Sequence, residues 1–121
     1  MRRDGIDRKL LEAADEIRIT KLTMIGEGKL TISDSQEIRE IATLLSGKKE
    51  ETREYVCTPD SILYRVEFCN TGESLAFFPV DGHFVKLGND WYWMKEDSLV
   101  KKLDTITKDL QLKAHEPCTF G

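Results

Sequence analysis

The stretch ILYRVEFCNTGESLAFFPVDGHFVKLGNDWYWM, residues 62–94, decides the fold class of this chain. Apolar side chains occupy every second position from Ile62 to Phe68, a period typical of a β-strand. Three turn signals follow, namely Asn70-Thr71-Gly72-Glu73, Asp81-Gly82 and Asn89-Asp90. The stretch therefore predicts four short antiparallel strands joined by three tight turns.

Closing these turns in the simplest way predicts which side chains share a face of the sheet. The pairs expected are Val66 with Phe77, Phe78 with Val85, Leu87 with Tyr92, and Lys86 with both Phe77 and Trp93. One face then carries Tyr64, Val66, Phe68, Leu75, Phe77, Phe84, Trp91 and Trp93. The other carries Arg65, Glu67, Ala76, Phe78, Val85, Leu87, Tyr92 and Met94. A bulge would shift this register by one residue and exchange the faces.

The rest of the chain adds helices around this meander. Helices are expected over residues 5–16, after Ser33 or Asp34 up to Gly47, and over 98–112 with Asp97 as N-cap. Strands are expected over 17–25, 29–33 and 55–57, with Gly26-Glu27-Gly28 as a turn. The charge run 48–54 is interpreted as a solvated loop and 113–121 as a frayed tail. The prediction is a single α+β domain over 1–121: a mainly antiparallel sheet, formed by an N-terminal hairpin and a four- to five-strand meander, with two to three amphipathic helices packed on it.

The second helix has the clearest sequence signals. Ser33 or Asp34 is followed three residues later by Gln36 or Glu37, which is the pattern of a capping box. Its apolar stripe follows at helical spacing and consists of Ile38, Ile41, Ala42 and Leu45.

Composition and charge exclude several classes of protein. The chain has 121 residues and a net charge of −4, whereas a protein that binds the phosphate backbone of nucleic acids needs a basic stripe. No apolar run approaches the ~20 residues of a transmembrane helix. No apolar segment follows the basic start of the chain, so we expect a cytoplasmic protein. An extracytoplasmic location is the alternative if Met1 replaces a removed signal peptide.

Catalytic and metal-binding patterns are weak, so no cofactor is expected. Cys57, Cys69 and Cys118 make a poor disulfide framework, and the meander places Cys57 and Cys69 too far apart to form a bridge. A nucleophile–base pair of Cys57 with His83 would need contact between strands that the meander separates. His115 and Cys118 supply two possible metal ligands, while a structural zinc site needs four. These observations favour a non-enzymatic protein.

One constellation remains as a candidate binding site: Phe77, Phe84, Lys86, Trp91 and Trp93. Exposed on the sheet, these residues would hold an apolar or cationic anchor of a partner, with Lys86 as a cation–π donor. Covered by a helix, they would simply form the core, which burial statistics favour. The first hypothesis is a binding or accessory domain with a protein partner or a second copy of the chain. The alternative is a small-molecule or carbohydrate binder, or a minor enzyme, with a pocket between sheet and helix near Arg65, Glu67 or His83.

Overall fold

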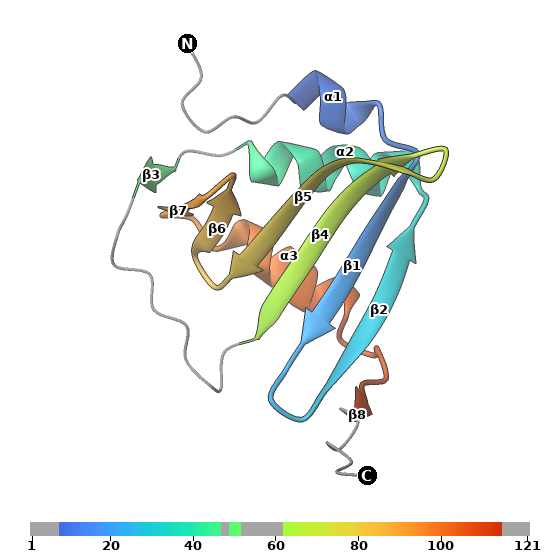
Figure 1. The fold of residues 1–121 in the computed structure, drawn as a ribbon, viewed down its shortest axis with the longest axis vertical. Helices are drawn as coiled ribbons and strands as arrows, with labels where there is room; N and C mark the ends of the chain where they lie inside the picture. Colours follow the sequence, from blue (N-terminus) through green and yellow to red (C-terminus); the bar gives the residue numbers. More distant parts are fainter. Residues whose placement is uncertain (1–7, 47–48, 52–61, 115–121) are drawn as a thin grey trace, which may run out of the picture.

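The computed structural model describes residues 8–46, 49–51 and 62–114. In chain order the elements are α1 (Arg8–Glu12), β1 (Glu16–Leu22), β2 (Gly26–Ile32), α2 (Ser35–Leu45), β3 (Glu50–Glu51), β4 (Leu63–Asn70), β5 (Glu73–Asp81), β6 (Phe84–Leu87), β7 (Asp90–Trp93), α3 (Ser98–Ile106) and β8 (Lys113–Ala114). The strands form one antiparallel sheet in the order β3-β7-β6-β5-β4-β1-β2-β8 (Figure 1). The predicted α+β class, with an N-terminal hairpin and a meander, is confirmed.

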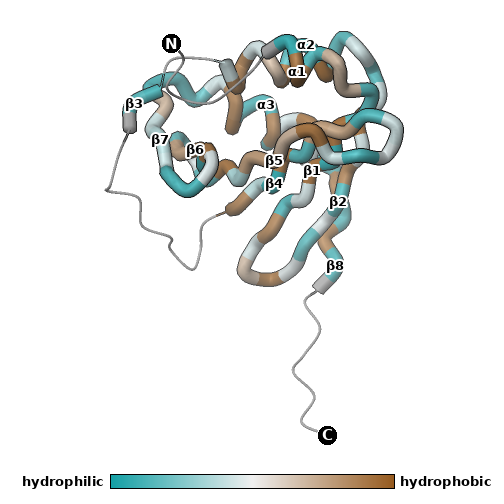
Figure 2. Tube along the Cα trace, turned by 45° about the horizontal axis from the view of Figure 1, so that its top comes forward, coloured by the Kyte–Doolittle hydropathy of each residue, from teal (hydrophilic) through white to brown (hydrophobic). Residues whose placement is uncertain are grey.

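The N-terminal hairpin turns two residues earlier than the glycines suggest. β1 ends at Leu22, and Met24 and Ile25 form the tip, closed by a hydrogen bond from Thr23 N to Gly26 O of 2.9 Å. The predicted turn at Gly26-Glu27-Gly28 is therefore wrong, because these residues belong to β2. The tip is apolar and exposed, as the brown loop between β1 and β2 in Figure 2 shows.

Position 28 of β2 is a glycine because another segment of the chain passes close to its backbone. A Cβ atom at this position would lie 2.8 Å from Leu110 Cδ2 and 3.0 Å from the backbone oxygen of Gln111. Only glycine leaves room for this crossing, since it has no Cβ. The segment after α3 then continues into β8, where Lys113 pairs with Glu27.

The three turns of the meander lie where the sequence indicates, but the second closes one residue later and the third one residue earlier than predicted. Thr71 and Gly72, both at positive φ, join β4 to β5. The next two turns have Gly82 and Gly88 at their first central position with φ of 60° and 66°. A turn in which only the first of the two central residues has positive φ is a type II′ turn. Each turn therefore closes around Gly-His and Gly-Asn rather than Asp-Gly and Asn-Asp.

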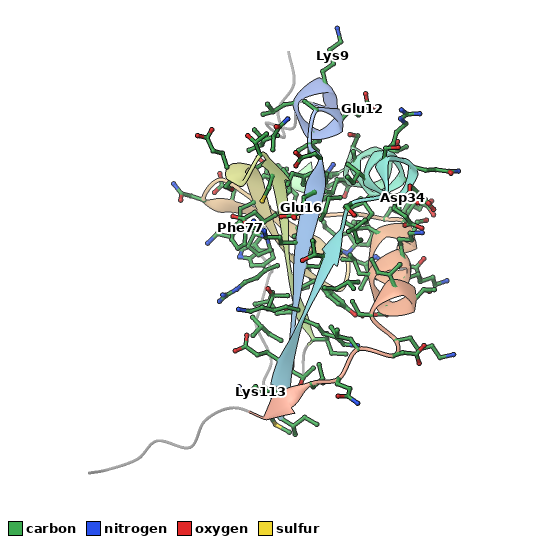
Figure 3. All side chains as sticks on the ribbon, turned by 90° about the vertical axis from the view of Figure 1, so that its right-hand side faces the viewer. Lys9, Glu12, Glu16, Asp34, Phe77 and Lys113 are labelled. Carbon is green, nitrogen blue, oxygen red and sulfur yellow. The ribbon has the colours of Figure 1, made fainter. Side chains whose placement is uncertain are left out.

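The helices α2 and α3 lie on one side of the sheet, and α1 lies at its end. Figure 3 shows the sheet edge-on, with α2 and α3 on one side and the labelled side chain of Phe77 pointing to the other. We call the side away from α2 and α3 the open face. Pairing of β1 with β4 joins the hairpin to the meander in this sheet, so that Ile19 lies between Leu30 and Val66.

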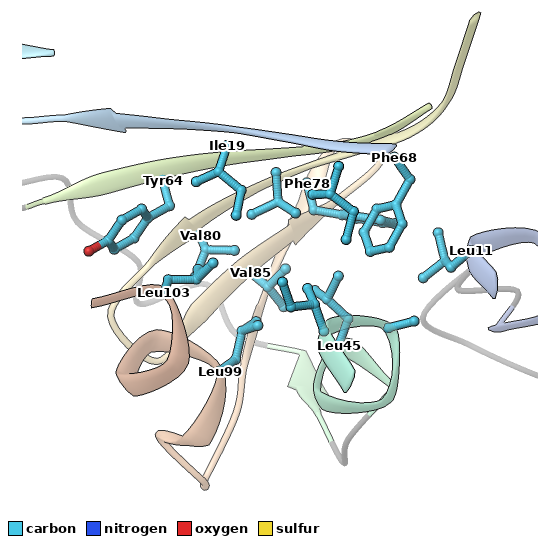
Figure 4. Close-up of a cluster of buried hydrophobic side chains, with 14 of the residues drawn as sticks. Leu11, Ile19, Leu45, Tyr64, Phe68, Phe78, Val80, Val85, Leu99 and Leu103 are labelled. Atoms are coloured by element: carbon cyan, nitrogen blue, oxygen red, sulfur yellow. The ribbon is translucent and has the colours of Figure 1, made fainter. Parts of the chain in front are cut away.

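The hydrophobic core fills the space between the sheet and the helices (Figure 4). Its sheet side consists of Ile17, Ile19, Tyr64, Val66, Phe68, Phe78, Val80, Val85 and Leu87. The helices contribute Leu11, Ile38, Ile41, Ala42, Leu45, Leu99 and Leu103. Burial of these side chains provides the main driving force for folding.

The predicted second helix is confirmed with its cap and its stripe. Asp34 is the N-cap, and its Oδ1 accepts hydrogen bonds from the backbone N–H of Gln36 at 2.8 Å and of Glu37 at 3.4 Å. The four predicted stripe residues are all buried. Lys102 Nζ of α3 then pairs with Glu37 Oε2 at 2.9 Å and Glu40 Oε2 at 3.2 Å, which ties the two helices together.

Several predicted boundaries are wrong. The first helix ends at Glu12 rather than at residue 16, because Glu16 and the residues after it pair with β4. The predicted loop 48–54 contains β3, which pairs with β7, and the predicted tail begins with β8. α3 ends at Ile106, and its N-cap Asp97 pairs with Lys101 instead of capping the backbone. The predicted strand 55–57, Gly47, Cys57, His115 and Cys118 lie outside the described residues.

Candidate functional site

A bulge between β4 and β5 decides which aromatic residues reach the core. Cys69 lies opposite Ser74, as the simplest register predicts, but Phe68 lies opposite Ala76. Leu75 is the extra residue, and from there on Val66 faces Phe78 instead of Phe77. A shift of one residue turns every later side chain of the strand to the other face. The bulge that the sequence analysis gave as an alternative to the simplest register is therefore present.

The five candidate residues Phe77, Phe84, Lys86, Trp91 and Trp93 share the open face. Phe84 lies opposite Trp93, Lys86 lies opposite Trp91, and Phe77 lies opposite Glu67. Residues paired in this way point to the same side of an antiparallel sheet. None of the five is buried, and Phe77 is 48% exposed. The interpretation of these residues as core is wrong, and we call them the aromatic face.

His83 holds one end of the aromatic face in place. Its ring stacks on Trp93 with the centroids 5.7 Å apart and the planes 21° apart. The His83 Nδ1 atom lies 2.7 Å from the carbonyl oxygen of Met94, and Met94 N donates to the His83 carbonyl oxygen at 2.8 Å. The histidine therefore positions Trp93. The proposed pair of His83 with Cys57 involves a residue outside the described ones.

Beside the aromatic face, the open face of β1, β2, β4 and β5 forms a cavity of about 340 Å³. We call it the cationic cavity. Its lining residues are Arg18, Ile19, Thr20, Lys29, Leu30, Thr31, Arg65, Glu67 and Phe77. Three of these side chains are cations and one is a carboxylate. Phe77 belongs to both the cavity and the aromatic face, so the two surfaces are continuous.

The cations of the cavity have few anionic partners within the protein. Arg18 Nε donates to Glu16 Oε2 at 2.6 Å, and this hydrogen bond is the main reason why the pKa of Arg18 is raised. Among the residues that the structure describes, no carboxylate forms an ion pair with Lys29 or Arg65. Two of the three cations are thus available to a ligand.

The buried polar groups beneath the sheet serve the fold. The Tyr64 hydroxyl contacts Asp104 Oδ1 and lies 3.3 Å from Thr107 Oγ1, on α3 and the turn after it. Burial, followed by the hydrogen bond to Asp104, raises the pKa of Tyr64 far above its ordinary value of 10.0. On the opposite side of the sheet, where Cys69 lies opposite Glu16, burial raises the pKa of the Cys69 thiol and so lowers its reactivity.

The sequence missed the cationic cavity for a topological reason. Arg65 is far from Arg18 and Lys29 in the chain, and the three side chains converge because β1 lies between β2 and β4. The only local signal is that polar residues alternate along β1 and β2, at Arg18 and Thr20 and at Lys29 and Thr31. The expected pocket between sheet and helix is occupied by core side chains in the described structure. Arg65 and Glu67 line a cavity on the opposite side.

The comparisons with known proteins add no assignment. No family model, no curated protein and no solved structure matches this chain. In the described part of the chain, no three histidine, cysteine or acidic side chains gather as a metal site. The helices described here are all too short or too polar to cross a membrane.

Proposed function

We propose that this chain is a non-enzymatic binding domain whose aromatic face contacts a partner protein. The observation that carries this proposal is the position of Phe77, Phe84, Trp91 and Trp93 on the open face. The outer face of an antiparallel sheet is normally polar, because it is solvated. Aromatic residues there are costly for a free domain and typical of interface centres.

The side chains of the aromatic face suit a hot spot. Tryptophan contributes large contact areas at low entropic cost and is enriched among the residues that dominate binding energy. The stacking of His83 on Trp93 fixes one indole before binding, which reduces the entropy lost on association.

The charges near the aromatic face favour a partner with apolar side chains bordered by carboxylates. Lys86 lies opposite Trp91 at the centre, and Arg65 and Lys29 lie in the adjoining cavity. A carboxylate rim would complement these cations and would speed association. A second copy of the chain is less suitable, since each copy has a net charge of −4.

The carbohydrate or small-molecule alternative changes its location. Its site would lie on the open face, because tryptophan rings on an open sheet are also a platform for sugar rings. The experiment described next also tests this alternative.

The test compares the wild-type domain with Trp91→Ala, Phe77→Ser and a control on another surface. Met24→Ala is the matched control, because Met24 is an apolar side chain 68% exposed at the β1–β2 tip. A protein captured by immobilised wild type is purified, and its affinity is measured by calorimetry. We expect Trp91→Ala to lose ~2 kcal/mol of binding free energy or more, as hot-spot residues do, and Met24→Ala to lose little.

Three results would contradict the proposal. Equal affinity of Trp91→Ala and Met24→Ala would show that the partner binds elsewhere. Specific binding on a glycan array, lost in Trp91→Ala, would support the carbohydrate alternative instead. A dimer in solution that Phe77→Ser dissociates would identify a second copy as the partner.

A further inference from the structure

We infer that the cationic cavity binds an oxyanion, namely the phosphate or carboxylate group of a ligand whose apolar part lies on the Phe77 ring. This inference goes beyond the proposed protein contact and does not depend on it. It concerns β1, β2, β4 and β5, with Phe77 common to both surfaces, whereas the tryptophans of the aromatic face are on β7.

The strand register brings the three cations together. Thr20 lies opposite Lys29 on one side and Arg65 on the other, while Arg18 lies opposite Thr31 and Glu67. Lys29 and Arg65 are therefore both diagonal neighbours of Arg18. Diagonal positions are roughly 7–8 Å apart, within reach of long side chains. Like charges at this spacing repel each other in the free protein, and a bound anion would offset this repulsion through its attraction to each cation.

The net charge of the cavity favours an anion although the chain is acidic. Its lining has three cations and one carboxylate, which gives 3 − 1 = +2. Glu16 is outside the lining but forms an ion pair with Arg18; when its negative charge is also counted, the net charge is still +1. The whole chain has a net charge of −4, so its field opposes a long polyanion such as nucleic acid. A single oxyanion in the cavity avoids most of this repulsion.

The donors of the cavity match an oxyanion in number and geometry. Glu16 accepts from Nε of Arg18, and the Nη groups carry the remaining N–H donors of that guanidinium. The planar guanidinium of Arg65 can donate two parallel hydrogen bonds to a phosphate or carboxylate. The ammonium group of Lys29 and the hydroxyls of Thr20 and Thr31 add further donors around the cavity.

The size of the cavity and its one aromatic wall restrict the ligand. A volume of about 340 Å³ is at the lower end of small-molecule sites. Phe77 is the lining residue that offers an exposed ring, and it is 48% exposed. A ligand with one oxyanion and one flat apolar ring would therefore use both parts of the cavity.

The test titrates the isotope-labelled protein, followed by NMR, with four probes: inorganic phosphate, phenyl phosphate, benzoate and neutral benzyl alcohol. We expect saturable shifts of the Thr20 and Thr31 amides with the three anions, and tighter binding of phenyl phosphate than of inorganic phosphate. Benzyl alcohol should not saturate. The comparison of phenyl phosphate with benzoate identifies which oxyanion is preferred.

Variants locate the site. Arg65→Gln and, independently, Lys29→Gln should each weaken phenyl phosphate binding about tenfold, the typical effect of losing one charge-assisted hydrogen bond. Arg39→Gln on the exposed surface of α2 is the matched control and should change nothing. Phe77→Ser should remove the advantage of phenyl phosphate over inorganic phosphate.

The control for the proposed function is Trp91→Ala, which should bind phosphate as the wild type does. The test of oxyanion binding can thus give a negative result while the test of the protein contact gives a positive one, or the other way round. Equal affinities of Arg65→Gln, Lys29→Gln and Arg39→Gln, or shifts spread over all basic side chains, would overturn the inference. Circular dichroism of each variant confirms that the fold is intact.

Discussion

Gly28→Ala is the substitution whose effect the structure predicts most directly. The new methyl group would lie 2.8 and 2.9 Å from Cδ2 and Cγ of Leu110 and 3.0 Å from the carbonyl oxygen of Gln111. The leucine side chain can move, but the backbone of the segment that leads to β8 must move with it. Overpacking of this kind typically costs about 1–3 kcal/mol.

An opposite effect reduces this cost. Replacing glycine by alanine lowers the entropy of the unfolded chain and stabilises a protein by about 0.4–1 kcal/mol where no clash occurs. The net expectation is a destabilisation of about 0.5–2 kcal/mol, from these two contributions. In urea unfolding, it should lower the midpoint by roughly 0.3–1 M. Amide exchange at β8 should accelerate as well, because its pairing with β2 depends on this crossing.

The control is the same substitution in a Leu110→Ala background. Without the leucine side chain most of the clash disappears, so Gly28→Ala should be nearly neutral or stabilising there. A Gly28→Ala variant as stable as the wild type, or one with the same cost in both backgrounds, would refute the reasoning. It would mean that the segment after α3 does not cross β2 at this point.

Further predictions test the helix contacts and the open face. Tyr64→Phe should lower the free energy of unfolding by about 1 kcal/mol, measured in urea, because the contact with Asp104 is lost. The raised pKa of Tyr64 stabilises the fold below pH 10, and this contribution should decrease as pH rises above 10, an alkaline loss that is smaller in Tyr64→Phe. Lys102→Met should cost about 0.5–1 kcal/mol, and less in 1 M NaCl, whereas Lys101→Met, which removes a more exposed pair, should cost almost nothing. Both tryptophans are half-buried on the open face, so acrylamide should quench part of their emission; a blue-shifted emission that acrylamide does not quench would contradict this position.

The sequence alone determined the local elements of this protein. Period-two alternation and glycine turns were sufficient for β4 to β7, and the capping signal at Asp34 with its apolar stripe was sufficient for α2. It also predicted correctly that Phe77, Phe84, Trp91 and Trp93 share one face, because the second and third turns each displaced the predicted pairing by an even number of residues. These features depend on residues close together in the chain, and the physical forces that fix them are local.

Only the tertiary structure decided which face the helices cover and what lies on the other. The extra residue Leu75 turned the aromatic residues away from the core. The insertion of β1 between β2 and β4 brought Lys29, Arg18 and Arg65 together. Gly28 was read as a turn residue, although its role is to let a distant segment pass. Such features depend on contacts between distant residues, and in a sheet with a side-chain period of two, one inserted residue is enough to exchange its faces.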